Sequence, residues 1–373
     1  MAGGQTPPRI LLARPDHLGD VLLTLPAIAL LRRALPHAQI SVLVSAAVAA
    51  VPRHCPDVDA TYTAPFSPLA AWPDPPGWPA IVARTAAKLR GQFDLAILPR
   101  PDDPVTGALV AAAGIPVRLG YACPRTTPFL TVALPAPPRR HVAALACDLV
   151  PVAADCFGVR RPPELGMPTP RYFVPTPADE AEAAMALVHV RARCGPQPIL
   201  IHPAAGWPIK SWPPARWVAL AARLRARYGV CPLVVCGPDA RETEAAIIAM
   251  SAGAACGLGE ALSLGALAAV QQQARLVVGI DSGPLHLAAL LGTPVISLFG
   301  PADPLEFRPW CPPDRYRVVR VPLACSPCGT LMDPPCGASR DPACMTGITV
   351  DAALAAVQDL LNTQTFLPIA VKE

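Results

Sequence analysis

The chain of 373 residues carries a net charge of +4, and apolar residues make up 52% of it against 16% charged residues. A chain of this length is too long for a single ordinary hydrophobic core, so two domains are expected. The high apolar content excludes a disordered protein. The small net charge excludes a strongly basic nucleic-acid-binding protein, so no nucleic acid is expected as a partner. No apolar stretch reaches the length of a membrane span, and the N-terminus lacks a signal-peptide pattern, so we expect a cytoplasmic protein.

Short apolar runs alternate with longer alanine- and leucine-rich segments along the first half, which is typical of a parallel sheet with crossover helices. The strands predicted there are 10–14, 39–44, 60–63, 95–98 and 118–121. The predicted helices are 22–34, 79–90, 104–113 and 142–150. The segment 159–177 is rich in proline and has no clear periodicity, which places a domain boundary in it.

The same alternation resumes in the second half, with strands predicted at 199–202, 231–236, 276–280 and 295–299. Helices are predicted at 213–228, 241–250, 264–273, 282–291 and 351–361. The sequence therefore predicts an α/β protein of two doubly wound, Rossmann-like domains, 1–168 and 169–350, facing each other across a cleft. The segment 351–373 holds a last helix and tail, and we expect the helix to pack back on the N-terminal domain. Ligands of such sheets bind where strands end and helices begin.

The first polar turn, 14–20, follows the opening strand and reads Arg-Pro-Asp-His-Leu-Gly-Asp. Gly19 permits a tight turn, and Asp20 then stands at a helix start with its carboxylate directed into the cleft. A carboxylate there can accept a proton from an attacking hydroxyl group. An aspartate at this position can equally serve only as the N-cap of the helix.

A second polar turn, 281–286, follows the predicted strand 276–280 and reads Asp-Ser-Gly-Pro-Leu-His. Ser282 or Gly283 would cap the next helix, and Pro284 suits its first turn. Free N–H groups at this helix end would bind a diphosphate, with His286 one turn further as an additional donor. The alternative for His286 is a buried structural histidine.

The third polar turn, 202–212, contains the small residues Ala205 and Gly206 and ends with Lys210 just before a helix. Lys210 there would neutralise negative charge that grows on a departing phosphate, although most lysines are merely solvated. Glu242 follows the strand 231–236 and can bind ribose hydroxyls, as acidic residues do in this fold class. An exposed carboxylate at a helix start is the competing interpretation. Neither a GxGxxG nor a GxxxxGK[ST] phosphate loop is present.

These three turns, in this order, resemble glycosyltransferase family 9, the ADP-heptose:lipopolysaccharide heptosyltransferases. The matching stretches are RPDHLGDVLLTLPAI, HPAAGWPIKSWPPARW and GIDSGPLHLAALLGTPVISLFGPADP. The resemblance implies a GT-B fold, an inverting direct displacement and no metal in catalysis. The pair Asp57 and Asp59 formally matches the DxD pattern by which many other glycosyltransferases hold a metal, but no further ligands lie near it in the sequence.

The resemblance also implies a role for each matched position. Asp20 takes the place of the general base. Ala205 cannot make the hydroxyl hydrogen bond that family members often make to the diphosphate, so its backbone N–H or Ser211 must compensate. The implied donor-binding residues are Ala205, Gly206 and Lys210 at the diphosphate, Glu242 at the ribose, Leu262 at the adenine, and Asp281, Ser282, Gly283 and His286 at the sugar and phosphates.

Four of the 13 cysteines lie in a loop rich in proline and glycine before the last helix, namely Cys325, Cys328, Cys336 and Cys344. A CxxC pair followed by two further cysteines can ligate zinc or iron tetrahedrally. Some members of the family carry a comparable loop, and the protein-modifying heptosyltransferases resemble it with bound iron. Such a metal would be structural, because all four ligands come from the protein. Reduced thiols or a disulfide within the loop are the alternatives.

The leading hypothesis is an inverting, metal-independent enzyme that moves heptose from ADP-heptose to a lipopolysaccharide core acceptor. The N-terminal domain would then bind the glycolipid acceptor and carry the base, and the C-terminal domain would bind the nucleotide sugar. Such an acceptor is compatible with peripheral contact at the inner membrane surface. A transferase with another nucleotide sugar or a protein acceptor, and a non-catalytic nucleotide-sugar-binding protein, are the other hypotheses. The presence of Asp20 together with Lys210 argues against the last, because a scaffold has no need of a positioned base.

Overall fold

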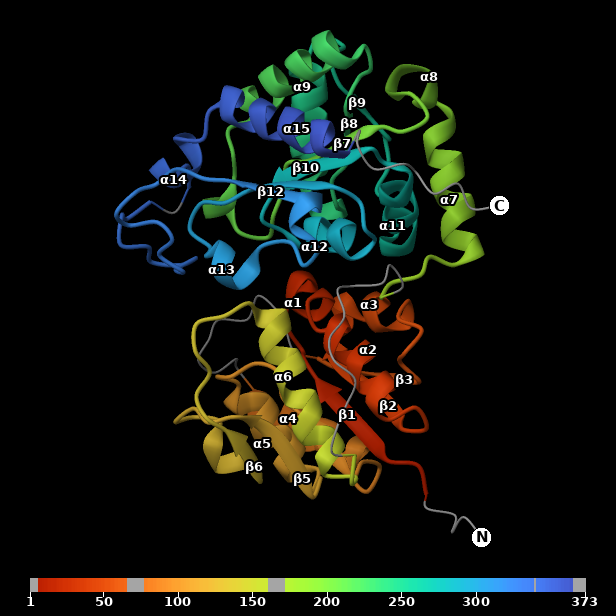
Figure 1. Cartoon of the computed structure of the whole chain (residues 1–373), viewed down its shortest axis with the longest axis vertical. Coiled ribbons are helices and arrows are strands. Elements are labelled where there is room, and N and C mark those ends of the chain that lie inside the picture. Colours follow the sequence, from red (N-terminus) through yellow and green to blue (C-terminus); the bar gives the residue numbers. More distant parts are fainter. Residues whose placement is uncertain (1–5, 66–76, 160–171, 339, 365–373) are drawn as a thin grey trace. The chain divides into compact units, whose positions relative to one another are not determined.

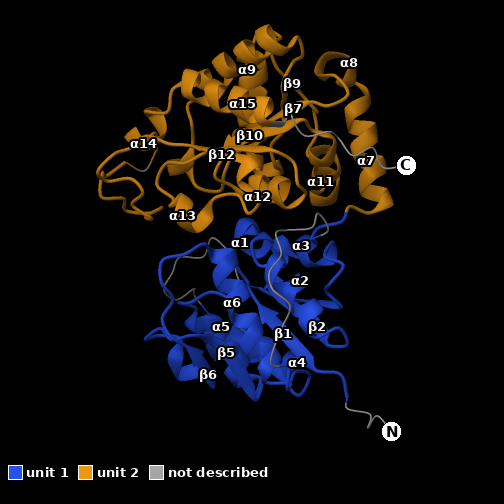
Figure 2. Cartoon of the chain, in the orientation of Figure 1, with its two compact units in different colours: residues 1–174 blue, residues 175–373 orange. Residues whose placement is uncertain are grey.

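The chain divides into two compact units, residues 1–174 and 175–373, each built on a parallel sheet of six strands (Figure 2). The computed structural model describes residues 6–65, 77–159, 172–338 and 340–364. The predicted α/β class is confirmed by both sheets and their helices. Most of the proline-rich segment 159–177 lies outside the described residues. No helix among the described residues is long and apolar enough to span a membrane.

The sheet of unit 1 has the strand order β3-β2-β1-β4-β5-β6. Its strands are β1 (Arg9–Ala13), β2 (Gln39–Ser45), β3 (Ala60–Ala64), β4 (Leu95–Ile97), β5 (Val117–Tyr121) and β6 (Val132–Leu134). The helices are α1 (Leu18–Leu22), α2 (Leu25–Ala34), α3 (Ala50–Arg53), α4 (Trp78–Leu89), α5 (Pro104–Ala112) and α6 (Val142–Asp155). The helices α2 and α6 contact each other, and so do α4 and α5 (Figure 1).

The alternation of side chains along β1 explains why this sheet is covered on both faces. Leu11 and Ala13 belong to the apolar cluster that includes residues of α4 and α5. Ile10 and Leu12 point to the opposite face, because successive side chains of a strand alternate, and they are fully buried there as well. A strand buried on both faces has to be apolar throughout, which is the pattern by which the sequence predicts it.

Where the sequence predicted one helix over 22–34, the structure has α2, which begins at Leu25, and a separate short helix α1, which ends at Leu22. Pro26 occupies the first turn of α2, where its missing N–H leaves no hydrogen bond unmade. The hydroxyl of Thr24, between the two helices, donates to the carbonyl oxygen of Val21 at 2.7 Å. The break matters for the site, because α1 then begins at Leu18 and carries Asp20 in its first turn.

The sheet of unit 2 has the order β12-β11-β10-β7-β8-β9. Its strands are β7 (Ile199–His202), β8 (Leu233–Val234), β9 (Cys256–Gly257), β10 (Leu276–Ile280), β11 (Val295–Leu298) and β12 (Tyr316–Val319). The helices are α7 (Pro177–Val188), α8 (Arg191–Cys194), α9 (Pro214–Tyr228), α10 (Arg241–Met250), α11 (Leu264–Gln273), α12 (Gly283–Leu290), α13 (Pro304–Phe307), α14 (Ala343–Thr346) and α15 (Val350–Gln364).

The C-terminal helix α15 is part of the core of unit 2, whereas the sequence placed it outside both domains. It contacts α9 and the strands β11 and β12. Val357 and Leu360 are fully buried in the same apolar cluster as Trp217 of α9. Arg317 of β12 lies 2.5 Å from the carboxylate of Asp359 on the outer side of the helix. These buried residues form part of an apolar stripe along α15, and burial of this stripe explains why the helix packs against the sheet of unit 2.

The two sheets share one topology. If the strands of each unit are numbered in chain order, both have the order 3-2-1-4-5-6, which is that of doubly wound nucleotide-binding sheets. The chain reverses its direction of winding between the first and fourth strands, that is, between β1 and β4 in unit 1 and between β7 and β10 in unit 2. Ligands of such sheets bind at the carboxyl ends of this strand pair. The three polar turns identified in the sequence follow β1, β7 and β10.

Candidate active site

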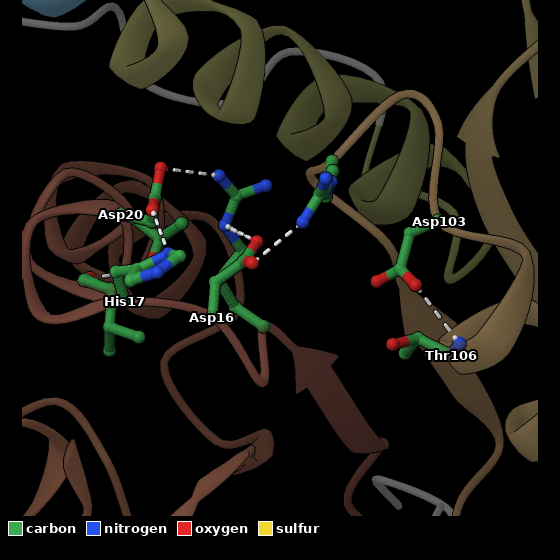
Figure 3. A network of polar contacts seen from close by, with 9 residues as sticks. Asp16, His17, Asp20, Asp103 and Thr106 are labelled. Carbon is green, nitrogen blue, oxygen red and sulfur yellow. Dashed lines mark hydrogen bonds and ion pairs between the residues drawn. The ribbon is translucent and has the colours of Figure 1, made fainter. Parts of the chain in front are cut away.

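The turn after β1 in unit 1 holds a network of charged side chains (Figure 3). The guanidinium group of Arg14 lies between two carboxylates, 3.2 Å from Asp16 and 3.0 Å from Asp20. His17 lies 3.7 Å from the second carboxylate oxygen of Asp20. Arg14 is buried, with 6% of its surface exposed, so its charge needs these acidic partners.

A second arginine connects this turn to the loop after β4. Arg100 donates to the carboxylate of Asp16 at 2.7 Å, although the two residues are 84 positions apart in the sequence. The pair therefore joins the ends of the first and fourth strands at the crossover of the sheet. Asp103, further along the same loop, is the N-cap of α5 and accepts from the backbone N–H of Thr106 at 3.1 Å (Figure 3). Arg14 and Asp16 lie within the first polar turn, 14–20, but no role was predicted from the sequence for them or for Arg100.

Asp20 lies in the first turn of α1, but it does not cap the helix. The N-cap residue is His17, and no side chain makes a capping hydrogen bond. The interpretation of Asp20 as a mere N-cap is therefore wrong. Burial by itself would raise the pKa of Asp20, but the positive charge of Arg14, the hydrogen bond with His17 and the charge of Arg100 outweigh it and lower this pKa well below its ordinary value. Asp20 is consequently an ionised carboxylate that remains partly exposed at this edge of the sheet.

Asp16, His17 and Asp20 also form a group whose ligand atoms lie within 4.8 Å of one another. Carboxylates and imidazole in such a cluster can bind a divalent cation. Here, however, Arg14 and Arg100 already neutralise the carboxylates, and a cation would be placed against two guanidinium groups. These residues do not fit a metal site. The acidic pair 57–59 does not fit one either, because Asp59 accepts from Arg32 at 2.6 Å and from the backbone N–H of Ile40 at 2.7 Å.

Unit 2 carries its own charged cluster at the crossover between β7 and β10. The ammonium group of Lys210 lies 2.5 Å from one oxygen of Asp281, and the imidazole of His286 lies 3.5 Å from the other. Lys210 and Asp281 are 71 positions apart and come from the turns after the first and fourth strands of the sheet. Burial acts to raise the pKa of Asp281, but Lys210 and His286 lower it below the ordinary value. Three of the predicted residues are thus brought together.

The amino end of α12 lies beside this cluster. Ser282 is the N-cap in an extended conformation, and its side chain makes no capping hydrogen bond. Among the described residues, the hydroxyl of Ser282 and the Nδ1 atom of His286 are buried without a hydrogen-bond partner. The amide of Gln271 in α11 donates to the carbonyl oxygen of Pro284 at 2.9 Å and fixes the first turn of the helix. Buried polar atoms without a partner are uncommon in proteins, and at this place they are available to a ligand.

The turn after β7 comes close to β10 because Gly279 has no side chain. A Cβ atom at Gly279 would lie 2.5 Å from the backbone oxygen of His202. His202 itself is buried, and burial lowers its pKa to about 4, so its imidazole is neutral at physiological pH. Ala205 and Gly206 follow in this turn, and a Cβ at Gly206 would meet no atom within 4 Å. The backbone of this loop is therefore open toward one side.

The remaining predicted donor residues lie apart from these contacts. Glu242 is exposed in the first turn of α10, and Leu262 packs partly buried against the apolar cluster beneath α11. The buried acid of α10 is Glu244, which accepts from the backbone N–H of Cys236 at 3.1 Å, just after β8. Burial raises the pKa of Glu244. Glu244 and the apolar Ile247 are three positions apart and therefore share one face of the helix. This spacing would have predicted from the sequence that Glu244 is buried.

The cysteine loop carries the four thiols for which a structural metal site was predicted. Cys344 is buried, whereas Cys325 and Cys336 are exposed. Burial raises the pKa of Cys344, and the three other thiols raise it further. Within the described part of the chain, no three of these cysteines bring their sulfur atoms within 4.8 Å of one another. A tetrahedral zinc or iron site needs four thiolates at closer mutual spacing, so the structural metal site stays a prediction.

These observations define the class of protein: an α/β chain of two units with the same doubly wound sheet, each with charged side chains at the crossover of its strands. A family model described as glycosyltransferase family 9 (heptosyltransferase) matches residues 82–334. The chain belongs to this family.

Individual relatives agree with this assignment. Lipopolysaccharide heptosyltransferase 3 of Escherichia coli is 33% identical over 123 residues, which cover 32% of this chain and 36% of that protein. This alignment therefore spans about a third of the relative's length. Lipopolysaccharide heptosyltransferase 1 of Salmonella typhimurium is 28% identical over 303 residues, or 79% of this chain and 89% of that protein. The structure of E. coli ADP-heptose lps heptosyltransferase II matches with a TM-score of 0.70 at 19% identity, covering 96% of this chain and 99% of that one. It confirms the predicted GT-B fold.

Breaking the pair of Lys210 and Asp281 is expected to destabilise unit 2 in a pH-dependent manner. Lys210→Met leaves a buried carboxylate with only His286 as a partner, so the free energy of unfolding should fall by about 3 kcal/mol at neutral pH. The lowered pKa of Asp281 stabilises the fold above the ordinary carboxyl pKa and ceases to do so as the pH falls through its folded value. The loss caused by Lys210→Met should therefore be largest near pH 7 and should shrink as the pH falls below the ordinary carboxyl pKa of 3.8.

Urea unfolding of Lys210→Met, Asp281→Asn and the double variant measures this coupling as a double-mutant cycle. Lys88→Met, at an exposed position of α4, is the matched control and should change stability little. Additive effects of the two substitutions, with no interaction between them, would show that the pair contributes nothing to stability.

Proposed function

We propose that this protein is an inverting, metal-independent glycosyltransferase that moves heptose from ADP-heptose to an acceptor of the lipopolysaccharide core. The observation that carries the proposal is the cluster of Lys210, Asp281 and His286 at the crossover of unit 2, beside the amino end of α12. The names of the relatives support the heptose donor and the lipopolysaccharide pathway. The acceptor would then be a glycolipid.

The donor diphosphate is proposed to bind at the amino end of α12. A helix amino end offers free N–H groups and a partial positive charge, both of which favour an anion. Lys210 has three N–H donors, and its contact with Asp281 uses one of them, so it can also bind a phosphate oxygen. Ser282 and His286 each have a buried polar atom without a partner among the described residues. Ala205 and Gly206 would offer backbone N–H groups from the open loop after β7.

Other parts of the donor are assigned to neighbouring residues. Asp281 has a carboxylate held ionised by Lys210 and His286, and it would accept hydrogen bonds from sugar hydroxyls. Glu242, exposed in the first turn of α10, would bind the ribose, and the backbone at Leu262 would meet the adenine. Gly283 would let a phosphate approach the backbone, because it has no side chain.

Asp20 is proposed to be the general base. The acceptor hydroxyl oxygen attacks the anomeric carbon of the donor, the bond from this carbon to the β-phosphate oxygen breaks, and ADP leaves. The hydroxyl proton passes to the carboxylate of Asp20. Because its neighbours lower the pKa of Asp20, this carboxylate is a weak base, and we expect the proton to move late, when the attacking oxygen has become acidic. Lys210, His286 and the N–H groups of α12 would stabilise the charge on departing ADP.

The substitution Asp20→Asn removes the proton acceptor at nearly unchanged volume. We expect turnover with ADP-heptose to fall about a hundredfold or more, because general base catalysis contributes a factor of this size. Binding of ADP, measured by calorimetry, should stay within about twofold, because the donor contacts proposed above belong to unit 2.

Asp155→Asn, at an exposed position in the last turn of α6, is the matched control and should retain full turnover. Near-normal turnover of Asp20→Asn would exclude Asp20 as the base. Absence of any transfer or donor hydrolysis by the wild-type protein, with ADP bound, would instead favour a non-catalytic nucleotide-sugar-binding protein.

The network around Asp20 predicts a shift in the pH profile. An enzyme whose general base must be ionised loses activity when the pH falls through the pKa of that base. Because the pKa of Asp20 is lowered, the acid limb of kcat/KM in the wild type should lie below the ordinary carboxyl range. Arg14→Gln removes the nearest positive charge and should raise this apparent pKa by about one unit or more. Arg14→Lys keeps the charge and should restore most of the wild-type profile.

Arg32→Gln is a suitable control, because Arg32 forms an ion pair with Asp59 elsewhere in unit 1. It should leave the acid limb unchanged, and circular dichroism should verify folding at each pH. An unchanged acid limb in Arg14→Gln would mean that Arg14 does not set the protonation of the base.

A further inference from the structure

Three buried thiols meet at the amino edge of the sheet in unit 2. Cys194 ends α8, Cys231 precedes β8, and Cys256 opens β9. The sulfur atoms of Cys194 and Cys256 are 2.9 Å apart, well inside the van der Waals separation of two sulfur atoms. The three residues retain 1%, 5% and 2% of their surface exposed, respectively. They lie at the opposite edge of the sheet from Lys210 and Asp281, because all strands of the sheet are parallel.

Backbone hydrogen bonds hold the three cysteines in place. The N–H of Cys231 donates to the carbonyl oxygen of Arg193 at 2.9 Å, and the N–H of Cys256 donates to that of Pro232 at 3.0 Å. The short connection between α10 and β9 turns through Ala252 and Gly253, both with positive φ. The sulfur atoms therefore meet through main-chain geometry that the sheet fixes.

Two arginines cover the cluster from the outside. The guanidinium group of Arg193 lies 3.0 Å from the carbonyl oxygen of Gly253 and 3.9 Å from the sulfur atom of Cys231. Arg225 reaches the same carbonyl oxygen at 2.8 Å. Both arginines are exposed, so the thiols lie directly beneath the surface and within reach of a small oxidant.

The surroundings favour a thiolate at Cys256. The hydrogen bond with Cys194 lowers the pKa of Cys256, burial opposes this, and Arg193, the Cys231 thiol and Arg225 lower the pKa further. The same contact with Cys256, together with burial, raises the pKa of Cys194. A thiolate next to a thiol is the arrangement in which an oxidised sulfur is rapidly resolved.

We propose that Cys194 and Cys256 form a reversible oxidation site that closes to a disulfide when a hydroperoxide is reduced. The thiolate of Cys256 attacks one oxygen of hydrogen peroxide, the O–O bond breaks, and with one proton a molecule of water leaves. The sulfenic acid so formed is attacked by the sulfur of Cys194, the new S–S bond forms, and a second water leaves. Two thiols thus lose two hydrogen atoms, that is, two protons and two electrons, and one peroxide becomes two waters.

The disulfide would join residues 62 positions apart and tie α8 to β9. A cross-link over such a loop stabilises the folded chain by restricting the unfolded one. Because the cluster is remote from the proposed donor residues, oxidation should change stability rather than ADP binding. Failure of this site would therefore leave the proposed function untouched.

Peptide mapping of the full-length protein tests the site. The protein is treated with hydrogen peroxide, its free thiols are blocked with N-ethylmaleimide, and it is digested without reduction. We expect a linked peptide containing Cys194 and Cys256, lighter by two hydrogen atoms than its separate parts and released by dithiothreitol. The Tm of the treated protein should rise by about 5 °C or more, and reduction should reverse the increase.

Cys256→Ala should abolish the linked peptide and the rise in Tm. Cys311→Ala, at another buried cysteine of unit 2, should abolish neither and is the matched control. Mapping of the wild-type protein decides the question even if Cys256→Ala folds poorly. A dominant link to Cys231, or oxidation confined to exposed cysteines such as Cys325, would overturn the proposal.

Discussion

An ion pair joins the turn after the first strand to the turn after the fourth strand in each of the two sheets. In unit 1 the pair is Asp16 with Arg100, and in unit 2 it is Lys210 with Asp281. These are the two strands between which a doubly wound sheet changes direction, and ligands of such sheets bind at their carboxyl ends. Charges placed there are partly withdrawn from water and must be paired, which fixes the positions of the loops that carry them.

The two units differ in which charged group the arrangement leaves available. In unit 1 two arginines surround the acids, and Asp20 is left as an ionised, partly exposed carboxylate. In unit 2 one lysine and one histidine hold a single buried aspartate, and Lys210 keeps further donors for another anion. In the proposed reaction, unit 1 would supply the proton acceptor and unit 2 the place for the diphosphate. Cationic side chains and helix N–H groups would then stabilise the negative charge on the leaving group.

The sequence predicted the elements that depend on local patterns. Buried strands such as β1 and β10 are continuously apolar, and the polar turns after them stand out against that background. The contacts between distant residues could not be predicted in this way. The pairing of Asp16 with Arg100 follows from which strands become neighbours, and sequence periodicity does not contain that information. The burial of Glu244 was missed because its neighbour Glu242 occupied the position favoured by the family resemblance.

The edge strands β6 and β12 were not predicted from the sequence. Both are only partly buried, so their apolar pattern is weak. Cys194 and Cys256 are 62 positions apart in the sequence, yet the fold of unit 2 brings their sulfur atoms to 2.9 Å from each other.

The central claim is that Lys210, at the crossover of unit 2, binds the diphosphate of the donor. Calorimetric titration of ADP and of adenosine into the wild type and Lys210→Met tests it most directly. We expect the wild type to bind ADP at least about tenfold more tightly than adenosine, and Lys210→Met to lose most of this difference while its affinity for adenosine is kept. An undiminished preference for ADP in the variant would contradict the account.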